Sequence, residues 1–529
     1  MMHSRAVYLA AVLGSLFWFP IPVLAQTDQE AVPLIMLKPQ GAGFSAPRLR
    51  KLYASLKKRA GKATSQILPL TKAEVWSVPK EKAEAVRKAA ARHGVTMSRL
   101  GATWRQIFQK APANMKMSDK QNSMMGLAKA SKAVMGVGVM MAPSPPMVEY
   151  ALTKDANDPS ASEAQKITVV LNDSTSLSIT RTSVDIKSDM CTWRGAVDGT
   201  GAPAILMWWP GGRMTGTVQH EGRLYSIRHM GGEMQAVVEM GENLMPQEHA
   251  SMPQRLRAND PNLRDDPLVQ QGDASTLRPQ AAPASNSKAA AIGPKTGQSA
   301  KAPTVGASAA DITIDVIVAY TRKAAGNYSD IKRELVDLSI EEGNESFRQS
   351  GIGQVKLRLV HVYQTDYVEE GTHFDHVWRF ADKGDGYMDE IHGLRDKYKA
   401  DVAVLIVDDP QGCGLATRVF ADADEAFAVV HHECAATSYS LAHEIGHLIG
   451  ARHDLNLDKI MKPFPYGHGY VNGTKWRDIM SYKESCGGCP RLPVWSSPLV
   501  KVKGELAGTA ELDNARVILE QAARVAAFR

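Results

Sequence analysis

The segment Leu441-Ala-His-Glu-Ile-Gly-His-Leu-Ile-Gly-Ala-Arg-His-Asp454 places three histidines and one glutamate close together in the chain. His443 and His447 are four residues apart, so on a helix both imidazoles project from one face, about one turn apart. That spacing suits two ligands of one zinc ion. Glu444 lies beside the first histidine, where its carboxylate can take a proton from a water molecule.

Gly450 and His453 extend this pattern. A glycine three residues after His447 allows the chain to leave the helix and turn sharply. His453 then returns as a third neutral ligand and leaves one coordination position open. The alternative is that these are ordinary helix histidines without a metal. The full pattern from His443 to Asp454 argues against that interpretation. The segment therefore predicts one catalytic Zn²⁺ per chain.

Residues 311–529 predict a compact α/β domain around this segment. Three apolar runs predict strands at 312–320, 355–363 and 401–407. Helical spacing predicts helices at 331–350, 386–399 and 517–528. Alternating strands and helices imply a mixed, largely parallel, twisted sheet with crossover helices. Residues 427–430 are expected to form an edge strand that aligns an extended peptide.

The sequence here resembles the metzincin metallopeptidases. The segment Trp476-Arg-Asp-Ile-Met-Ser-Tyr482 is similar to their Met-turn, which implies that Met480 lies beneath the zinc ligands. Asp454 is similar to the residue that follows the third histidine in reprolysins. Tyr482 instead resembles a tyrosine of astacins and serralysins that supports the transition state. The best match is the bacterial reprolysin-like group that includes the peptidyl-Asp metalloendopeptidases.

This resemblance implies hydrolysis of peptide bonds, with Glu444 as general base and Tyr482 as a second catalytic group. It also implies a preference for Asp or Glu at P1′, which needs a cation in the S1′ pocket. Arg491 and Lys483 follow the Met-turn and are the candidates. Arg491 is the better one, because a guanidinium can hold a carboxylate with two hydrogen bonds. The alternative is that both are solvated surface charges.

The first 310 residues are expected to be removed or to act on the domain that follows. Residues 1–25 have an early positive charge, an apolar run and small residues before Gln26, which is typical of a signal peptide and predicts secretion. Residues 26–245 predict an α+β, mostly β propeptide. Residues 246–310 are rich in Ala, Pro, Ser, Gln and Gly and predict a flexible linker.

Charge suggests that this leader docks on the catalytic domain. Residues 311–529 hold 25 Lys and Arg against 33 Asp and Glu, a net charge of −8, while the rest of the chain carries +14. The leader is therefore expected to be an intramolecular inhibitor of a zymogen, although chance composition explains the charges equally well. Cys191 is a candidate cysteine switch, with a buried, inert thiol as the alternative.

The other cysteines and histidines receive simpler interpretations. Cys413 is expected to pair with Cys434, and Cys486 with Cys489, as structural disulfides of an exported protein. The second pair could instead be a redox pair or half of a zinc site. The remaining histidines after residue 311 are expected to be packing or surface residues: His361, His373, His376, His392, His431, His432 and His468.

Two other functions compete with an endopeptidase. One is a secreted binding or adhesion protein whose zinc site is not catalytic, and the presence of Glu444 argues against it. The other is an enzyme acting on a different exported amide, such as a cell-wall peptide. The small overall net charge of +6 gives no reason to expect a nucleic-acid partner, and the N-terminal apolar run is too short for a stable membrane anchor.

Overall fold

The computed structural model describes residues 31–36, 46–61, 63–67, 74–95, 97–99, 134–141, 166–172, 175–187, 190–209, 213–231, 234–240, 245–246 and 311–529. They divide into two compact units. The first comprises the described residues of Met1–Ile67 and Ala73–Arg99, and the second those of Leu68–Lys72 and Leu100–Arg529. The predicted signal peptide and nearly all of the predicted linker lie outside the described residues, so both remain predictions.

The first unit is a small α/β structure. Its four strands pair in the order β2-β3-β1-β4, with bounds β1 Ala31–Met36, β2 Thr64–Ile67, β3 Glu74–Pro79 and β4 Met97–Arg99. Ala and charged residues at helical spacing predict a helix over residues 80–93, and helix α2 (Ala83–Ala91), preceded by the 3₁₀ turn η1 (Lys80–Lys82), confirms it. Helix α1 (Ala46–Ala60) was not predicted, although Leu52, Leu56 and Ala60 are buried at helical spacing.

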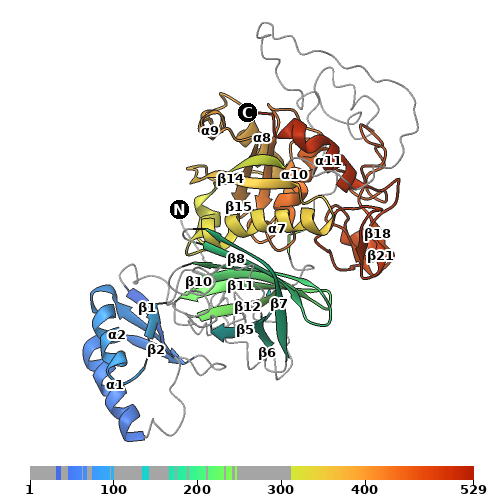
Figure 1. Ribbon diagram of the computed structural model, residues 1–529. Coiled ribbons are helices and arrows are strands. Elements are labelled where there is room, and N and C mark those ends of the chain that lie inside the picture. The colour runs from blue at the N-terminus through green and yellow to red at the C-terminus, as the bar shows by residue number, and fades with distance from the viewer. Residues whose placement is uncertain are drawn as a thin grey trace, which may run out of the picture. The chain divides into compact units, whose positions relative to one another are not determined.

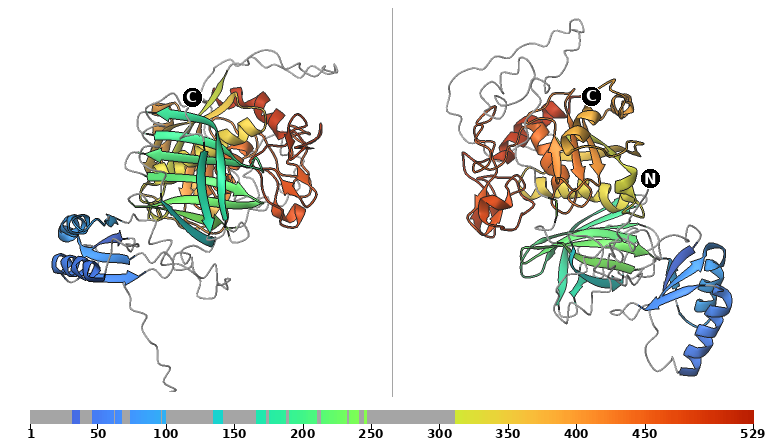
Figure 2. Two further views of the ribbon diagram at one scale, coloured as in Figure 1. Left: turned by 60° about the horizontal axis from the view of Figure 1, so that its bottom comes forward. Right: turned by 180° about the vertical axis from the view of Figure 1, so that it is seen from behind.

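A sheet of eight strands forms the leader part of the second unit, and we call it the leader sheet. Its strands pair in the order β5-β12-β11-β10-β9-β8-β7-β6. They are the green and teal strands of Figure 2. They are β5 Val134–Met141, β6 Lys166–Asn172, β7 Thr175–Lys187, β8 Met190–Val197, β9 Pro203–Trp209, β10 Arg213–His220, β11 Arg223–Gly231 and β12 Met234–Met240. Every neighbouring pair whose register is described runs antiparallel.

The alternating pattern of residues 216–228 predicts a single strand, but these residues belong to two strands of a hairpin. The turn is made by Glu221 and Gly222, with φ of 50° and 77°. Two consecutive positive φ values match the tight turn that joins twisted antiparallel strands. The single-strand expectation was wrong because alternation continues across so short a turn.

The C-terminal part of the second unit, residues 311–529, is a five-stranded sheet with helices on both faces (Figure 1). Strands β13 (Ile312–Tyr320), β14 (Val355–Gln364), β15 (Val402–Val407) and β17 (Phe427–His431) run parallel in the order β14-β13-β15-β17. Strand β16 (Gly414–Ala416) pairs antiparallel with β17 and is the outer strand. The expectation that residues 427–430 form the edge was therefore wrong, because β16 covers that side of β17.

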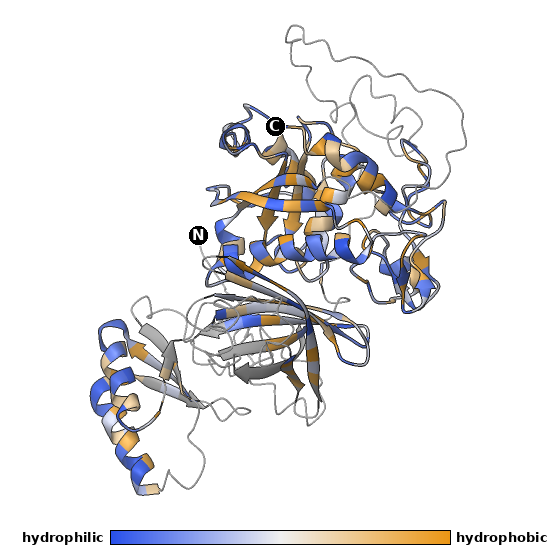
Figure 3. Cartoon of the chain, in the orientation of Figure 1, coloured by the Kyte–Doolittle hydropathy of each residue, from blue (hydrophilic) through white to orange (hydrophobic). Residues whose placement is uncertain are grey.

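Alternation along β15 explains the layers. Val402, Val404 and Ile406 belong to a core with helices α7 (Asp337–Gln349), α10 (Ser440–Ile449) and α11 (Asn514–Val525). Ala403, Leu405 and Val407 belong to a second core with α8 (His373–Ala381) and α9 (Glu390–Tyr398). A strand buried on both faces is apolar throughout, as the hydrophobic middle strands in Figure 3 show. Helix α8 was not predicted, and α7 is preceded by a π turn, η5 (Lys332–Val336).

Short elements complete the domain. They are α6 (Arg322–Ala325), η6 (Lys483–Cys486) and the two-stranded pairs β18 (Val471–Asn472) with β19 (Trp476–Arg477) and β20 (Lys501–Val502) with β21 (Glu505–Leu506). None of the helices among the described residues combines the length and the apolar character needed to cross a bilayer.

A buried ion pair next to the outer strand gives a stability prediction. Arg418 Nε lies 2.5 Å from Glu425 Oε2, and both side chains are buried. Glu425→Gln should lower the free energy of unfolding by roughly 3 kcal/mol, because it leaves a buried guanidinium without its counter-charge. Asp366→Asn removes the exposed Arg322 pair as a control and should cost less than about 1 kcal/mol. Calorimetry of both variants measures the difference, and equal melting temperatures would contradict the prediction.

Candidate metal centre

Helix α10 holds the first two histidines. Tyr439 precedes it in a left-handed conformation, with φ of 62°, and the helix then runs to Ile449. The ring centroids of His443 and His447 are 4.8 Å apart, so the four-residue spacing does place both imidazoles on one face. The helix is buried along its whole length, which fixes its rotation about its own axis.

Gly450 ends the helix and redirects the chain, as the sequence predicted. Its φ is 137°, and a Cβ at this position would lie 2.8 Å from Phe464 Cε2. His453 returns to the histidine pair after this turn. Its Nε2 atom lies 3.1 Å from Nε2 of His443 and 2.9 Å from Nε2 of His447.

The other ring nitrogens show which atoms are available to a metal. Nδ1 of His443 lies 2.9 Å from the carbonyl oxygen of Ile479, and Nδ1 of His447 lies 2.9 Å from that of Ala451. A carbonyl only accepts, so each Nδ1 carries the proton and each Nε2 presents a lone pair. Burial also lowers the pKa of His447 to about 4 and the pKa values of His443 and His453 well below the usual range. Two Nε2 lone pairs, with Nε2 of the neutral His453 beside them, fit a cation.

The Met-turn lies beneath this point. Met480 is fully buried, and a Cβ on Gly446 would lie 3.5 Å from its Sδ, so the methionine packs against the turn between the two helical ligands. Asp454 accepts a hydrogen bond from the amide of Tyr482 at 3.1 Å and another from Ser485 Oγ at 2.7 Å. Asp454 therefore connects the chain after the third histidine to the Met-turn.

Tyr482 lies next to the third histidine. Its ring centroid is 4.5 Å from that of His453 and 6.3 Å from that of His443. The side chain is only 5% exposed. The ring therefore lies at the edge of the histidine triad. This position suits a group that acts on a bound substrate.

Glu444 faces the outer strand of the sheet. A Cβ added to Gly414, the first residue of β16, would lie 2.6 Å from Oε1 of Glu444 and 2.9 Å from its Cγ. Only a glycine leaves room for the glutamate in its present position. Strand β16 and the Glu444 carboxylate are thus direct neighbours.

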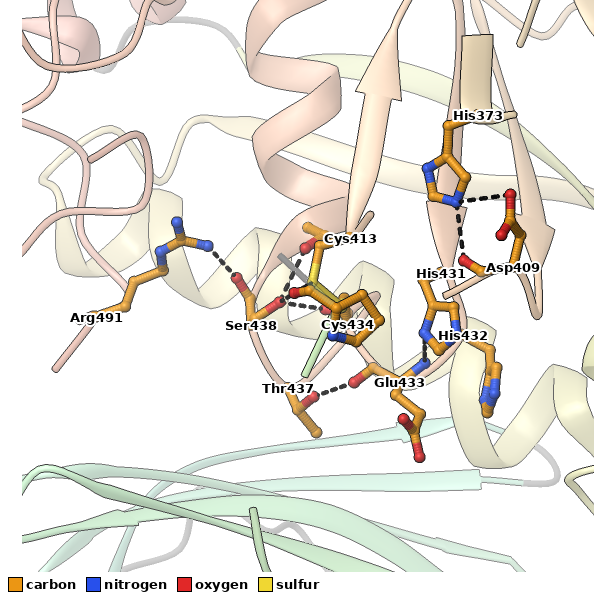
Figure 4. The surroundings of a disulfide bond; sticks show 12 residues. His373, Asp409, Cys413, His431, His432, Glu433, Cys434, Thr437, Ser438 and Arg491 are labelled. Carbon is orange, nitrogen blue, oxygen red and sulfur yellow. Dashed lines mark hydrogen bonds and ion pairs between the residues drawn. A yellow bond between two sulfur atoms is a disulfide. The ribbon is translucent and has the colours of Figure 1, made fainter. Parts of the chain in front are cut away.

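Arg491 is buried between two parts of the site, as Figure 4 shows for its bond to Ser438. One guanidinium nitrogen donates to the carbonyl oxygen of Ser438, just before α10, and another donates to that of Ser481, just after Met480. Its positive charge adds to the burial that lowers the pKa of His443. Lys483 is only half-buried, at the start of η6. The structure thus brings Arg491 to the histidines and leaves Lys483 at the surface.

The cysteines lie as the sequence predicted. Cys413 and Cys434 form a disulfide with a Cα–Cα distance of 5.4 Å, and Cys486 and Cys489 form another with 5.6 Å (Figure 4 shows the first). Cys191 is a free thiol in the core of the leader sheet, packed with Trp193 and Trp208, and burial raises its pKa to about 12. That position favours the inert thiol over the cysteine switch.

Two aspartates directly after β15 contact histidines that were expected to be packing or surface residues. Nε2 of His432 lies 3.4 Å from Asp408 Oδ1, and Nε2 of His376 lies 3.2 Å from Asp409 Oδ2. Asp408, His431 and His432 have the spacing of a metal site. However, Nδ1 of His431 accepts the Glu433 amide at 3.1 Å, so its Nε2 carries the proton and cannot also ligate. We interpret the cluster as hydrogen-bonded. The paired aspartates after a buried strand were the available sequence signal.

His468 supports the third ligand indirectly. Its Nδ1 lies 2.9 Å from the carbonyl oxygen of His453, and the ring is fully buried. Sequence reasoning assigned it no role, because nothing local to residue 468 indicates a contact with residue 453. Among the described residues, the triad is thus the one histidine group whose donor atoms and protonation both suit a metal.

Comparisons with known proteins agree with this geometry. A family model described as metallo-peptidase family M12, of the reprolysin type, matches residues 310–496. A peptidyl-Asp metalloendopeptidase of Xanthomonas campestris is 36% identical over 321 residues, 60% of this chain and 68% of that protein. One from Stenotrophomonas maltophilia is 34% identical over 331 residues, 62% of this chain and 70% of that protein.

A solved structure, metalloproteinase-II from Bacteroides fragilis, is 12% identical and covers 70% of this chain and 96% of that one, with a TM-score of 0.36. This likeness is too low to carry an argument. The family match covers the three histidines, and the two sequence relatives are more than 30% identical over more than two thirds of their own length. The chain belongs to the reprolysin-like metallopeptidases of family M12 and is a metalloendopeptidase.

Proposed function

We propose that this protein is a secreted, zinc-dependent endopeptidase made as a zymogen, with Glu444 as the general base. The observation that carries the proposal is the convergence of three histidine nitrogens within 4.8 Å of one another, on the helix and turn that also hold a buried glutamate. Imidazole is a preferred zinc ligand, and three protein ligands with one open position are typical of a catalytic site rather than a structural one. A non-catalytic binding or adhesion protein would have no use for the glutamate.

The chemistry divides between the metal and the chain. A zinc ion held by His443, His447 and His453 would supply a Lewis acid that polarises the scissile carbonyl and acidifies water. Glu444 accepts the proton of the attacking water and then gives it to the leaving amine. The Tyr482 hydroxyl donates a hydrogen bond to the oxygen on which negative charge develops.

Substrate binding is proposed along β16. This outer strand has one side free of β17, so an extended peptide could add to it through main-chain hydrogen bonds. The peptide would then pass directly over Glu444, because Gly414 of the strand abuts that side chain. We place the substrate here instead of at residues 427–430.

Specificity for an acidic P1′ residue is proposed to come from Arg491. The relatives are named peptidyl-Asp metalloendopeptidases, and a buried guanidinium beside the Met-turn is a suitable partner for a carboxylate. Its two hydrogen bonds to carbonyl oxygens hold it in place without neutralising its charge. The net charge of −8 of the domain is a weaker influence, because distant surface charges are screened.

The leader is proposed to keep the enzyme inactive. Gln219 of the leader sheet donates from Nε2 to the Tyr439 hydroxyl at 2.7 Å and to the Arg491 carbonyl oxygen at 3.4 Å. The carbonyl oxygen of Pro246 lies 3.2 Å from Sγ of Cys413, next to the start of β16. These contacts support a leader that covers both the proposed S1′ wall and the proposed substrate strand.

The general base and the metal ligands can be separated by substitution. Glu444→Gln should retain stoichiometric zinc but lower kcat on an unfolded protein substrate by roughly 10²- to 10⁴-fold, since the water loses its proton acceptor. His447→Ala should lose the metal itself. Plasma mass spectrometry measures metal content, and a peptidase assay measures kcat. Normal proteolysis by Glu444→Gln would contradict the mechanism, and full zinc in His447→Ala would remove that ligand.

The hydroxyl of Tyr482 can be tested alone. Tyr482→Phe keeps the ring beside His453 and should lower kcat by roughly 10²-fold while changing KM little, because an oxyanion donor acts mainly in the transition state. Tyr470→Phe, also in the C-terminal part of the domain but outside the triad, serves as a control. A kcat equal to that of the parent enzyme would show that Tyr482 only packs against the site and that its hydroxyl takes no part in the reaction.

A peptide library tests the proposed pocket cation. The activated enzyme should prefer Asp or Glu at P1′, and Arg491→Gln should reduce that preference roughly tenfold or more, because it removes a charged hydrogen-bond partner. Arg491→Lys keeps the positive charge but removes the two-pronged hydrogen bonding of the guanidinium, so it separates the two contributions. Lys483→Met is the matched control. A preference that disappears in Lys483→Met but survives in Arg491→Gln would reverse the assignment.

A further inference from the structure

Helix α7 carries three carboxylates that are nearly inaccessible to water. Glu341, Glu342 and Glu345 are 9%, 3% and 8% exposed. Glutamates are almost never buried to this degree without a partner, because removing a carboxylate from water is costly. The partners of these three side chains therefore show what the helix surface is built to contact.

Two of the three carboxylates find a close partner in the leader sheet. Arg194 of β8 donates from one guanidinium nitrogen to Glu341 Oε2 at 2.6 Å. Thr217 of β10 donates a short hydrogen bond to Glu342 Oε1. Glu345 accepts a hydrogen bond from Arg348 Nε of its own helix at 2.9 Å and lies 3.9 Å from Arg194 Nε of the leader. The leader sheet thus supplies the close hydrogen-bond donors of Glu341 and Glu342, whereas Arg348 lies 4.0 Å from Glu341.

Apolar packing surrounds these polar contacts. Four leader side chains belong to the same hydrophobic core as α7: Met190, Ile205, Met207 and Trp209. Arg194 itself is 5% exposed, and its other guanidinium nitrogen contacts Asp185 of the leader at 2.6 Å. Charge pairs inside an apolar ring are weakly screened, so they hold two surfaces in one register.

We propose that the leader sheet stays bound to the catalytic domain after the chain is cut between residues 247 and 310, held on α7 by Arg194 and Thr217, and that it leaves as the pH rises. The inference rests on the proposed zymogen, since it names what retains the inhibitor. Cutting the connection alone would then not release the enzyme. Removal of the leader needs either a rise in pH or proteolytic degradation of the leader sheet.

The direction of the pH effect follows from Glu342. Burial, helped by the nearby charges of Glu345 and Glu341, raises the pKa of Glu342 to about 8 against the opposing effects of Thr217 and Arg348. Arg194 and Asp185 are the charged leader groups near this cluster. When the leader leaves, water reaches Glu342 and its pKa returns towards the ordinary value of about 4.3. The complex therefore holds an extra proton between these two values, and leader affinity falls as the pH rises through this range.

The experiment uses the full chain carrying Glu444→Gln, so that no self-digestion occurs. A recognition sequence for a specific protease is inserted within residues 247–310, the chain is cut there, and size-exclusion chromatography follows the two fragments. We expect co-elution at pH 6 and a dissociation constant at least tenfold higher at pH 8.5. Separation of the fragments at pH 6 would overturn the proposal. Because no activity is measured, this failure would leave the endopeptidase assignment untouched.

Variants identify the responsible groups. Glu342→Gln keeps the shape and hydrogen-bonding capacity but cannot titrate, so retention should lose its pH dependence; an unchanged pH profile would overturn the role of Glu342. Arg194→Met should weaken retention at both pH values by at least tenfold. Lys166→Met removes an exposed ion pair of the same sheet with Asp198 and should leave retention unchanged. An equal loss of leader retention in Arg194→Met and Lys166→Met would contradict a specific contact of Arg194 with α7.

Discussion

The rest of this structure depends on one constraint: Nε2 of His453 lies about 3 Å from Nε2 of His443 and from Nε2 of His447. The surrounding chain holds the three rings in this arrangement. Carbonyl oxygens of Ile479 and Ala451 impose it by holding the Nδ1 protons of His443 and His447. One of these carbonyls belongs to the Met-turn, and the metal centre is therefore assembled from segments far apart in the sequence.

Close backbone packing transmits this constraint through the domain. A Cβ on Gly446 would lie 2.5 Å from Trp495, and a Cβ on Gly343 would lie 2.9 Å from Leu357 and 3.5 Å from Ala442. Helix α10 is thus pressed between the segment after the Met-turn on one side and helix α7 on the other. Since α7 also carries the buried carboxylates that contact the leader sheet, the proposed inhibitor and the metal centre share one rigid support.

Electrostatics act locally here. The opposite net charges of the leader and the catalytic domain suggested docking, but the contacts that join them involve few charged groups, chiefly Arg194 with Glu341. Arg491, another buried cation, is held by carbonyl oxygens and not by the acidic surface of its domain. In both places burial strengthens the interaction of a single guanidinium, whereas the many surface charges are separated from one another by water.

The sequence by itself predicted the histidine triad, the turn at Gly450, the parallel sheet and, as the preferred pairing among several, both disulfides, because each depends on local spacing or on long apolar runs. It did not determine which strand lies at the edge, since β16 has only three residues and no periodicity to detect. Helices α1 and α8, the hairpin at Glu221 and Gly222, and the contact of Gly414 with Glu444 were likewise decided by tertiary structure. Tertiary structure also decided which ring nitrogen of His431 carries the proton and how deeply Glu342 is buried. Both depend on groups that only folding brings together.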